Sequence, residues 1–301
     1  MHESSLTVSP LTTLLEQRDL ILVTGKGGTG KSTLVAALAE LAARRRGRAL
    51  VVEFAAHPRL PQMVGAAAAV EAVNLDAEEM IGPALGRLVG LPGFAGMVLG
   101  NRVLRLFIRT SPSIREMITL DELRHLVDRW SAAGHPVLVD LPATGHALSF
   151  LDTPRAVHSM LRVGPLAQVA RRVEALLLDR ARTELVAIAL PEELPVNETI
   201  ELMRRAAEIG VSSRTVIVNQ VPESSLTAQD QPLLEALQRH SHGPLARFAG
   251  AAWSDYEGAD QARAQVERLK AAVGGQVIEV PRYFAPDPRA CVDTLVRTLS
   301  A

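Results

Sequence analysis

The sequence has one cysteine, no long hydrophobic run and almost no net charge, and each of these absences excludes a class of protein. Cys291 cannot form an internal disulfide, and a single thiol can build neither a cysteine-based zinc site nor a metalloid-binding cysteine triad. The longest apolar run without a charge, residues 88–101, is too short to span a bilayer and contains Gly and Pro. With a formal net charge of -1, nothing points to nucleic acid or to an anionic membrane.

The N-terminal stretch MHESSLTVSP is polar and lacks the apolar segment of a signal peptide. We therefore expect a cytoplasmic protein without stable membrane insertion. What the chain does have is 48% hydrophobic residues in a length of 301, which is enough for a sizeable core. We expect residues 1–301 to form one domain with a subdomain inserted in it.

Short continuous apolar runs alternate with helical patterns along most of the chain. Such runs are typical of strands that are buried on both faces of a parallel sheet. They lie at 20–23, 49–54, 136–141, 185–190, 215–220 and 276–280. Amphipathic helices are expected between most of them, for example over 32–46 and 197–210. The order predicts an α/β fold with a mostly parallel, doubly wound sheet and right-handed crossovers.

The long stretch at about 58–133 contains no strand-like run and has the pattern of several helices. We expect it to form a helical subdomain inserted between the second and third strands. Within it, residues 94–108 carry apolar side chains at spacings of three and four. This helix either packs against its neighbours or forms a groove for an apolar helix or protein client.

A glycine-rich loop follows the first predicted strand and opens the first long helix. Residues 25–32 fit G-x-x-x-x-G-K-[ST] in the strand-loop-helix context that identifies a phosphate-binding loop. Backbone N–H groups of such a loop converge on phosphate oxygens, and the helix N-terminus adds a favourable dipole. We expect Lys31 to reach the β and γ phosphates and the Ser32 hydroxyl to ligate Mg²⁺. The predicted nucleotide-binding residues here are Gly25, Lys26, Gly27, Gly28, Thr29, Gly30, Lys31, Ser32 and Thr33.

Two further charged residues bear on this site. Asp140 lies at the end of a buried apolar run and suits the Walker B role of holding Mg²⁺ through water. Lys26 is a second lysine in the loop, and it is costly to pack near Lys31 unless both meet anionic phosphate. The alternative is that Lys26 is a solvated loop charge.

Several segments together carry a resemblance to a known family. The loop K-G-G-x-G-K-[ST] resembles the deviant Walker A motif, and residues 142–146, PATGH, resemble the switch II element of the arsenical pump-driving and tail-anchored-protein-targeting ATPases. Residues 189–202, 216–221 and 111–123 resemble that family's P-E-x-L-x-V-x-E-T-x-x-L segment, its V-N-Q strand end and a helix start in its helical subdomain. These matches run in the family's order, and the chain is identified as a single-domain bacterial member.

The resemblance implies ATP and Mg²⁺ as ligands and ATP hydrolysis as the activity. It implies that Lys26 crosses a dimer interface to the partner's nucleotide, and that Asn219 contacts adenine. Pro281 and Arg282, in the segment 281–284, would flank the base. Asn219 can alternatively be read as a strand-terminating turn residue. Gly145 and His146 would belong to switch II, with His146 a structural or hinge residue rather than a base.

The chain departs from the family at switch I. The family's D-P-A-H carries an Asp that orients the attacking water, whereas residues 51–60 read VVEFAAHPRL. Either Ala55 or Phe54 takes the Asp position, and neither can polarise water. Glu53 is the only nearby carboxylate. Three interpretations remain. Glu53 takes the place of the switch I Asp, another part of the protein positions the water, or hydrolysis is slow. The predicted catalytic residues are thus Lys26, Lys31, Asp140 and Glu53.

A second departure is the lack of the C-x-x-C pair that bridges the tail-anchor-targeting dimer through zinc, so dimerisation must rest on nucleotide, Lys26 and apolar contacts. The leading hypothesis is a nucleotide-gated ATPase, a homodimer or a heterodimer with a paralogue, with weak or partner-dependent hydrolysis. The second is a non-hydrolysing nucleotide-binding regulator paired with an active paralogue. A filament- or surface-organising ATPase is disfavoured by the T-G-H switch.

Overall fold

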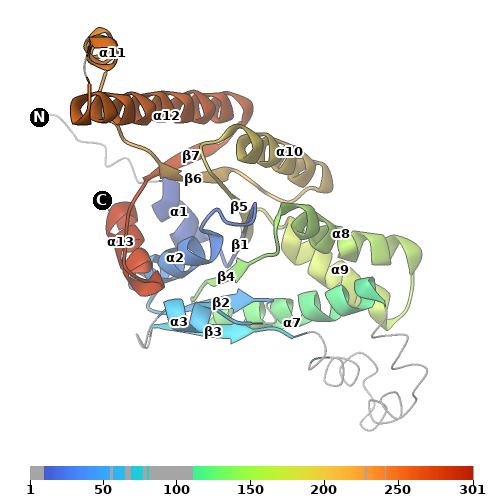
Figure 1. Cartoon of the computed structure of the whole chain (residues 1–301). Coiled ribbons are helices and arrows are strands. Elements are labelled where there is room, and N and C mark those ends of the chain that lie inside the picture. Colours follow the sequence, from blue (N-terminus) through green and yellow to red (C-terminus); the bar gives the residue numbers. More distant parts are fainter. Residues whose placement is uncertain are drawn as a thin grey trace, which may run out of the picture.

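The computed structural model describes residues 10–54, 57–64, 69–76, 80, 111–227, 229–240 and 242–300 (Figure 1). In these ranges seven strands form one sheet, and each neighbouring pair is parallel. The strands are β1 (Leu20–Gly25), β2 (Ala49–Glu53), β3 (Val70–Asn74), β4 (Val137–Asp140), β5 (Thr183–Ala189), β6 (Thr215–Val221) and β7 (Gln276–Pro281). Their order is β3-β2-β4-β1-β5-β6-β7. The predicted α/β fold with a parallel sheet is confirmed.

Helices cover both faces of the sheet, as a doubly wound fold requires. One face is covered by α1 (Pro10–Gln17), α2 (Lys31–Arg46), α3 (Leu60–Met63) and α13 (Pro288–Ser300). The other face is covered by α7 (Pro112–Ala132), α8 (Thr144–Met160), α9 (Pro165–Leu178), α10 (Glu193–Ile209) and α12 (Pro244–Ala272). Figure 1 shows α11 (Gln231–His240) outside α12, away from the sheet.

The central strands explain the continuous apolar runs in the sequence. Successive strand residues point to opposite faces, so Leu20 and Leu22 pack under α7, α8 and α9 while Ile21 and Val23 pack under α2 and α13. Every residue of β1 and of β5 is buried. Because both faces are covered, these strands need apolar residues at every position rather than at alternate ones.

Strand β3 corrects the prediction that no strand lies in residues 58–133. Val70–Asn74 pairs with β2 at the edge of the sheet, with Ala49 opposite Val70 and Glu53 opposite Asn74. Only its first residue is fully buried. Helix α7, which follows in the described part of the chain, therefore lies between β3 and β4 rather than between the second and third strands. The stretch 81–110, including the predicted helix 94–108, lies outside the described residues.

A pair of aromatic rings joins the end of β2 to α8. Phe54 directly follows β2, and its ring lies 5.3 Å from the ring of Phe150 with an interplanar angle of 53°. Both rings belong to the hydrophobic cluster beneath α7, α8 and α9. Tilted pairs of this kind add stability beyond the apolar area that they bury. The pair thus links the end of β2 to α8.

Among the helices within the described ranges, none combines the length and the apolar character needed to cross a lipid bilayer.

Removing the Phe150 ring should lower stability and loosen α8. Phe150 is 8% exposed, so Phe150→Ala should reduce the free energy of unfolding by about 3 kcal/mol. Urea unfolding followed by far-UV circular dichroism measures this. Phe284→Ala is the matched control, because that ring is 92% exposed and its loss should change stability by less than about 0.5 kcal/mol. Equal losses in the two variants would contradict the packing described.

Candidate nucleotide-binding site

The loop between β1 and α2 has the backbone of a phosphate cradle. Gly28 and Gly30 adopt φ of 87° and 82°, in the left-handed region that side chains disfavour. A Cβ on Gly30 would lie 2.5 Å from Nδ2 of Asn219, so this position has no room for a larger residue. At Gly27 and Gly28 no heavy atom lies within 4 Å of a Cβ position. The loop therefore presents open space that a phosphate group can fill.

Three charged or polar side chains meet where β1 and β4 end. Asp140 is the last residue of β4 and is in register with Val23 of the neighbouring β1. Its Oδ2 accepts a hydrogen bond of 2.5 Å from the Ser32 hydroxyl, and its Oδ1 lies 2.9 Å from the ammonium of Lys31. Lys31 also donates to the carbonyl oxygen of Leu141 at 2.6 Å. Sheet order, rather than sequence proximity, brings these groups together.

These residues open onto a pocket of about 390 Å³. It is lined by Lys31, Ser32, Glu53, Phe54, His57, Arg59, Asp140, Leu141 and Pro142. A hydroxyl and a carboxylate oxygen in contact are hard donors that suit Mg²⁺, and an adjacent ammonium suits phosphate. The residues present therefore fit the predicted Mg²⁺ and triphosphate, with Ser32 and Asp140 as the holders of the ion.

Glu53 lies in this pocket but has a structural task. It is in register with Asp140 and is 4% exposed. One carboxylate oxygen accepts the N–H of Arg59 at 3.1 Å and the other accepts the N–H of Leu60 at 3.2 Å. These are unpaired donors at the start of α3, so Glu53 caps that helix. The geometry favours a role in shaping the segment after β2 over a role as a base.

Ala55 and Phe54 are the two residues that can occupy the position of the missing switch I Asp. Ala55 lies outside the described residues. Phe54 turns its ring onto Phe150 and takes part in the core. An aromatic ring cannot orient water by accepting its proton.

Lys26 lies in the loop but is not among the residues that line the pocket. Its ammonium donates to Oε1 of Glu198, in α10, at 2.8 Å. The two side chains are 40% and 41% exposed, so this ion pair is worth less than about 1 kcal/mol. Lys26 is therefore held lightly enough for a stronger anionic partner to displace Glu198.

Asn219 joins the end of β6 to the loop. The side chain is fully buried, and its Nδ2 donates to the carbonyl oxygen of Thr29 at 2.8 Å. Among the described residues, Oδ1 has no hydrogen-bond partner. A buried acceptor without a donor is costly, and an exocyclic amino group such as that of adenine would satisfy it. The next residue, Gln220, has φ of 59°, which turns the chain sharply after Asn219.

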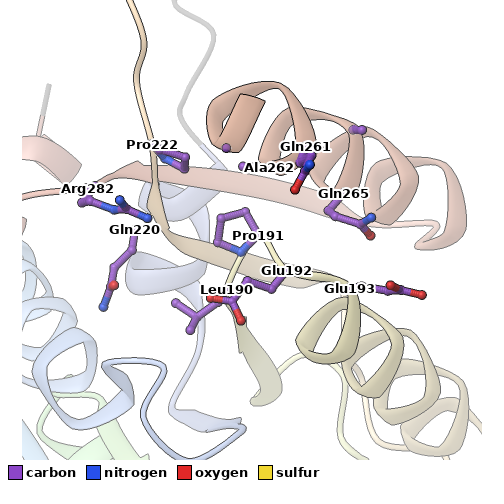
Figure 2. Close-up of a pocket in the computed structure, with 12 residues that line it drawn as sticks. Leu190, Pro191, Glu192, Glu193, Gln220, Pro222, Gln261, Ala262, Gln265 and Arg282 are labelled. Carbon is purple, nitrogen blue, oxygen red and sulfur yellow. The ribbon is translucent and has the colours of Figure 1, made fainter. Parts of the chain in front are cut away.

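A second pocket of about 450 Å³ lies at the ends of β5, β6 and β7 against α12 (Figure 2). Figure 2 shows Gln220 and Arg282 at one end of it and Glu193 at the other, with Gln261 and Gln265 reaching in from α12. The predicted base-flanking residue Arg282 thus belongs to this pocket. Its backbone N–H donates to the carbonyl oxygen of Val221, which holds the segment after β7 against the end of β6.

The remaining predicted residues lie farther out. Gly25 ends β1, and Thr33 is in the first turn of α2. Gly145 and His146 are exposed in the first turn of α8 and are not among the residues that line the Lys31 pocket. Pro281 lines a separate hollow with Glu223 and Arg263.

Sequence reasoning missed three residues at this site. Glu198 pairs with Lys26, and its place in the segment 189–202 was the only signal for it. His57 and Arg59 line the pocket beside Asp140, although they follow the expected switch I position. Only the fold shows that the segment after β2 turns back towards the Lys31 side of the sheet.

Tyr283 follows the last strand and lies half-buried beside Asn219 and Cys291. Burial, together with the charge of Cys291, raises the pKa of the Tyr283 hydroxyl to about 12, although a hydrogen bond with Asn219 acts in the opposite direction. The neutral phenol is therefore the form that the fold stabilises. Its ring helps to enclose the end of β6 from which Asn219 projects.

A phosphate cradle, an Asp–Ser–Lys cluster and a parallel sheet with this strand order define a P-loop nucleotide-binding protein, and comparison with known proteins agrees. Residues 20–282 match the family described as "CobQ/CobB/MinD/ParA nucleotide binding domain". The chain is 33% identical over 231 residues to ATPase BagA of Mycobacterium tuberculosis, covering 70% of this chain and 67% of that protein. It is 24% identical over 258 residues to ATPase ASNA1 homolog 1 of Paramecium tetraurelia, covering 70% and 78%. It is 27% identical over 259 residues to ATPase GET3 of Chaetomium globosum, covering 70% and 76%.

The chain belongs to the arsenical pump-driving and tail-anchored-protein-targeting ATPase family, within the CobQ/CobB/MinD/ParA nucleotide-binding class. The predicted membership is confirmed.

Replacing Glu53 should destabilise the fold. Glu53→Ala removes the acceptor of two backbone N–H groups and should lower the free energy of unfolding by about 1–2 kcal/mol. Glu53→Gln keeps one strong acceptor and should lose about half as much. Urea unfolding of the three proteins measures this. Unchanged stability in Glu53→Ala, with loss of ATP hydrolysis, would instead make Glu53 a base.

Tyr283 should titrate late and tie stability to pH. Its folded pKa of about 12 lies above the ordinary value of 10.0, so the contribution to stability is complete below pH 10 and is lost as the pH rises through 12. The chain has two tyrosines, so Tyr256→Phe leaves Tyr283 as the only tyrosine whose ionisation can raise the absorbance at 295 nm. The absorbance should rise with a midpoint near pH 12 while the protein remains folded. A midpoint near 10 in the folded protein would contradict the burial described.

Proposed function

We propose that this protein binds Mg-ATP and works as a nucleotide-gated dimeric ATPase with weak or partner-dependent hydrolysis. The observation that carries the proposal is the contact of Asp140 with both Ser32 and Lys31 at the mouth of the loop. Family membership supports nucleotide binding and ATPase chemistry in general.

The polar contacts at the loop assign a part to each residue. Ser32 and Asp140 would hold Mg²⁺, which when bound neutralises charge on the β and γ phosphates. Lys31 would leave the Leu141 carbonyl oxygen for phosphate, because an anion is a stronger partner than a neutral carbonyl. Oδ1 of Asn219 would accept a hydrogen bond from the adenine amino group, while its Nδ2 would continue to donate to the carbonyl oxygen of Thr29.

The position of Lys26 supports a dimer closed by nucleotide. Its ammonium is held by a half-exposed carboxylate, and Lys26 is not among the residues that line the pocket of its own chain. The triphosphate of a facing subunit carries several negative charges and would draw Lys26 from Glu198. The attraction between Lys26 and that triphosphate would be stronger than the Lys26–Glu198 ion pair that it replaces. The closed dimer would therefore be favoured only when nucleotide is present.

A partner surface would be coupled to the site through α8. This helix begins four residues after Asp140 and is tied to β2 by Phe54 and Phe150. Its last residue, Met160, is 81% exposed, and Val163, three residues farther along the chain, is 84% exposed. Such side chains suit an apolar partner. The predicted client helix at 94–108 lies outside the described residues.

A second candidate function is a regulator that binds ATP without turning it over and acts with an active paralogue. Phe54 and Glu53 favour it, because one is packed in the core and the other caps α3. Both readings share nucleotide binding and differ in turnover.

One experiment separates these readings. Oligomeric mass by light scattering and phosphate release should be measured together, with and without Mg-ATP. Wild type should shift from monomer to dimer with Mg-ATP, and Lys31→Ala should bind at least about 100-fold more weakly and stay monomeric. Lys26→Ala should bind ATP nearly as well as wild type yet fail to dimerise.

Lys270→Ala is the matched control, because that exposed lysine pairs with Glu267 and Glu279 on α12 and β7. It should behave as wild type. Binding without any turnover would select the regulator. If the wild-type protein neither binds Mg-ATP nor changes its oligomeric mass, both candidate functions are contradicted.

A further inference from the structure

The segment after β2 places a second cation, Arg59, in the pocket that holds Lys31. Arg59 is exposed and lines this pocket together with Lys31, Ser32 and Asp140. Its side chain makes no hydrogen bond or ion pair within the described part of the chain.

The backbone of Arg59 is fixed although its side chain is not. The N–H groups of Arg59 and Leu60 both bind the carboxylate of Glu53, and Glu53 is in register with Asp140. The buried carboxylate thus anchors the start of α3 next to the strand end that carries Asp140. The guanidinium therefore belongs to a hydrogen-bonded segment. It approaches the pocket from the β2 side rather than from the phosphate-binding loop.

Neither carboxylate that lines the pocket is paired with the Arg59 guanidinium in the described part of the chain. Asp140 is engaged by Lys31 and Ser32, and Glu53 is engaged by two backbone groups. A guanidinium is planar, permanently charged and matched to phosphate oxygens, so an anionic phosphate is the ligand that this corner lacks. It cannot accept a proton from water and so does not replace a switch I carboxylate.

We propose that Arg59 is the residue that distinguishes the triphosphate from the diphosphate, by binding the γ-phosphate from the β2 side of the pocket. This inference rests on the proposed ATP binding and adds a specificity-determining residue to it. The segment after β2 would then bind the terminal phosphate through a cation, although it lacks the carboxylate that would orient water. Release of that phosphate would free Arg59, and the link from Phe54 to Phe150 would pass the change to α8.

The test compares affinities for Mg-ATP and Mg-ADP by isothermal titration calorimetry of the full chain. Arg59→Ala should weaken ATP binding about 10- to 100-fold, the range of a charge-assisted hydrogen bond, and change ADP binding less than about twofold. Arg59→Lys should recover part of the loss, because an ammonium supplies charge without the planar fork. Melting temperatures should match that of wild type, since only an exposed side chain changes.

Arg44→Ala is the matched control, because Arg44 is exposed in the last turn of α2, at the opposite end of that helix from the loop. It removes the same charge and should leave both affinities unchanged. Equal losses for ATP and ADP in Arg59→Ala, no loss for either, or the same loss in Arg44→Ala would each overturn the role of Arg59 while leaving ATP binding intact. A wild-type chain that binds neither nucleotide would overturn the proposed function as well.

Discussion

The contact of Asp140 with Ser32 and Lys31 is the interaction on which the site depends. It joins the end of β4 to the start of α2, and it exists because the sheet order places β4 beside β1. A buried carboxylate without a partner is costly, so the contacts with Lys31 and Ser32 stabilise the charge of Asp140 at the mouth of the loop. In the proposed function a triphosphate would compete for Lys31 with Asp140 and the Leu141 carbonyl oxygen, and its binding would rearrange these groups.

Two routes lead outward from that rearrangement. One runs along the backbone from Asp140 into α8, and the other crosses from the end of β2 through the Phe54–Phe150 pair to the same helix. Packed aromatic rings transmit a displacement because a close-packed core does not absorb it. On the other side of the loop, Lys26 and Glu198 link the P-loop to α10. The site thus reaches two helices that lie on the face opposite α2.

Much of the fold and part of the site could be predicted from the sequence, for physical reasons. Central strands that are buried on both faces are mostly apolar, and β7, although it lies at the edge of the sheet, also carries a short apolar run, so six strands could be recognised from the sequence. The loop could be recognised by its glycines, two of which adopt φ values that side chains disfavour. Strand β3 was missed because an edge strand such as Val70–Asn74 is half-exposed and need not be apolar. The pairing of Lys26 with Glu198, the capping by Glu53 and the position of Arg59 depend on segments far apart in sequence or on one side-chain orientation. No local pattern encodes them.

A crystal structure with Mg²⁺ and a non-hydrolysable ATP analogue tests the central claim most directly. The account predicts the triphosphate in the loop, with Lys31 moved from the Leu141 carbonyl oxygen to phosphate and Ser32 and Asp140 holding the ion. Lys31 still bound to Asp140 and Leu141, with the analogue absent from the loop or bound elsewhere, would contradict it.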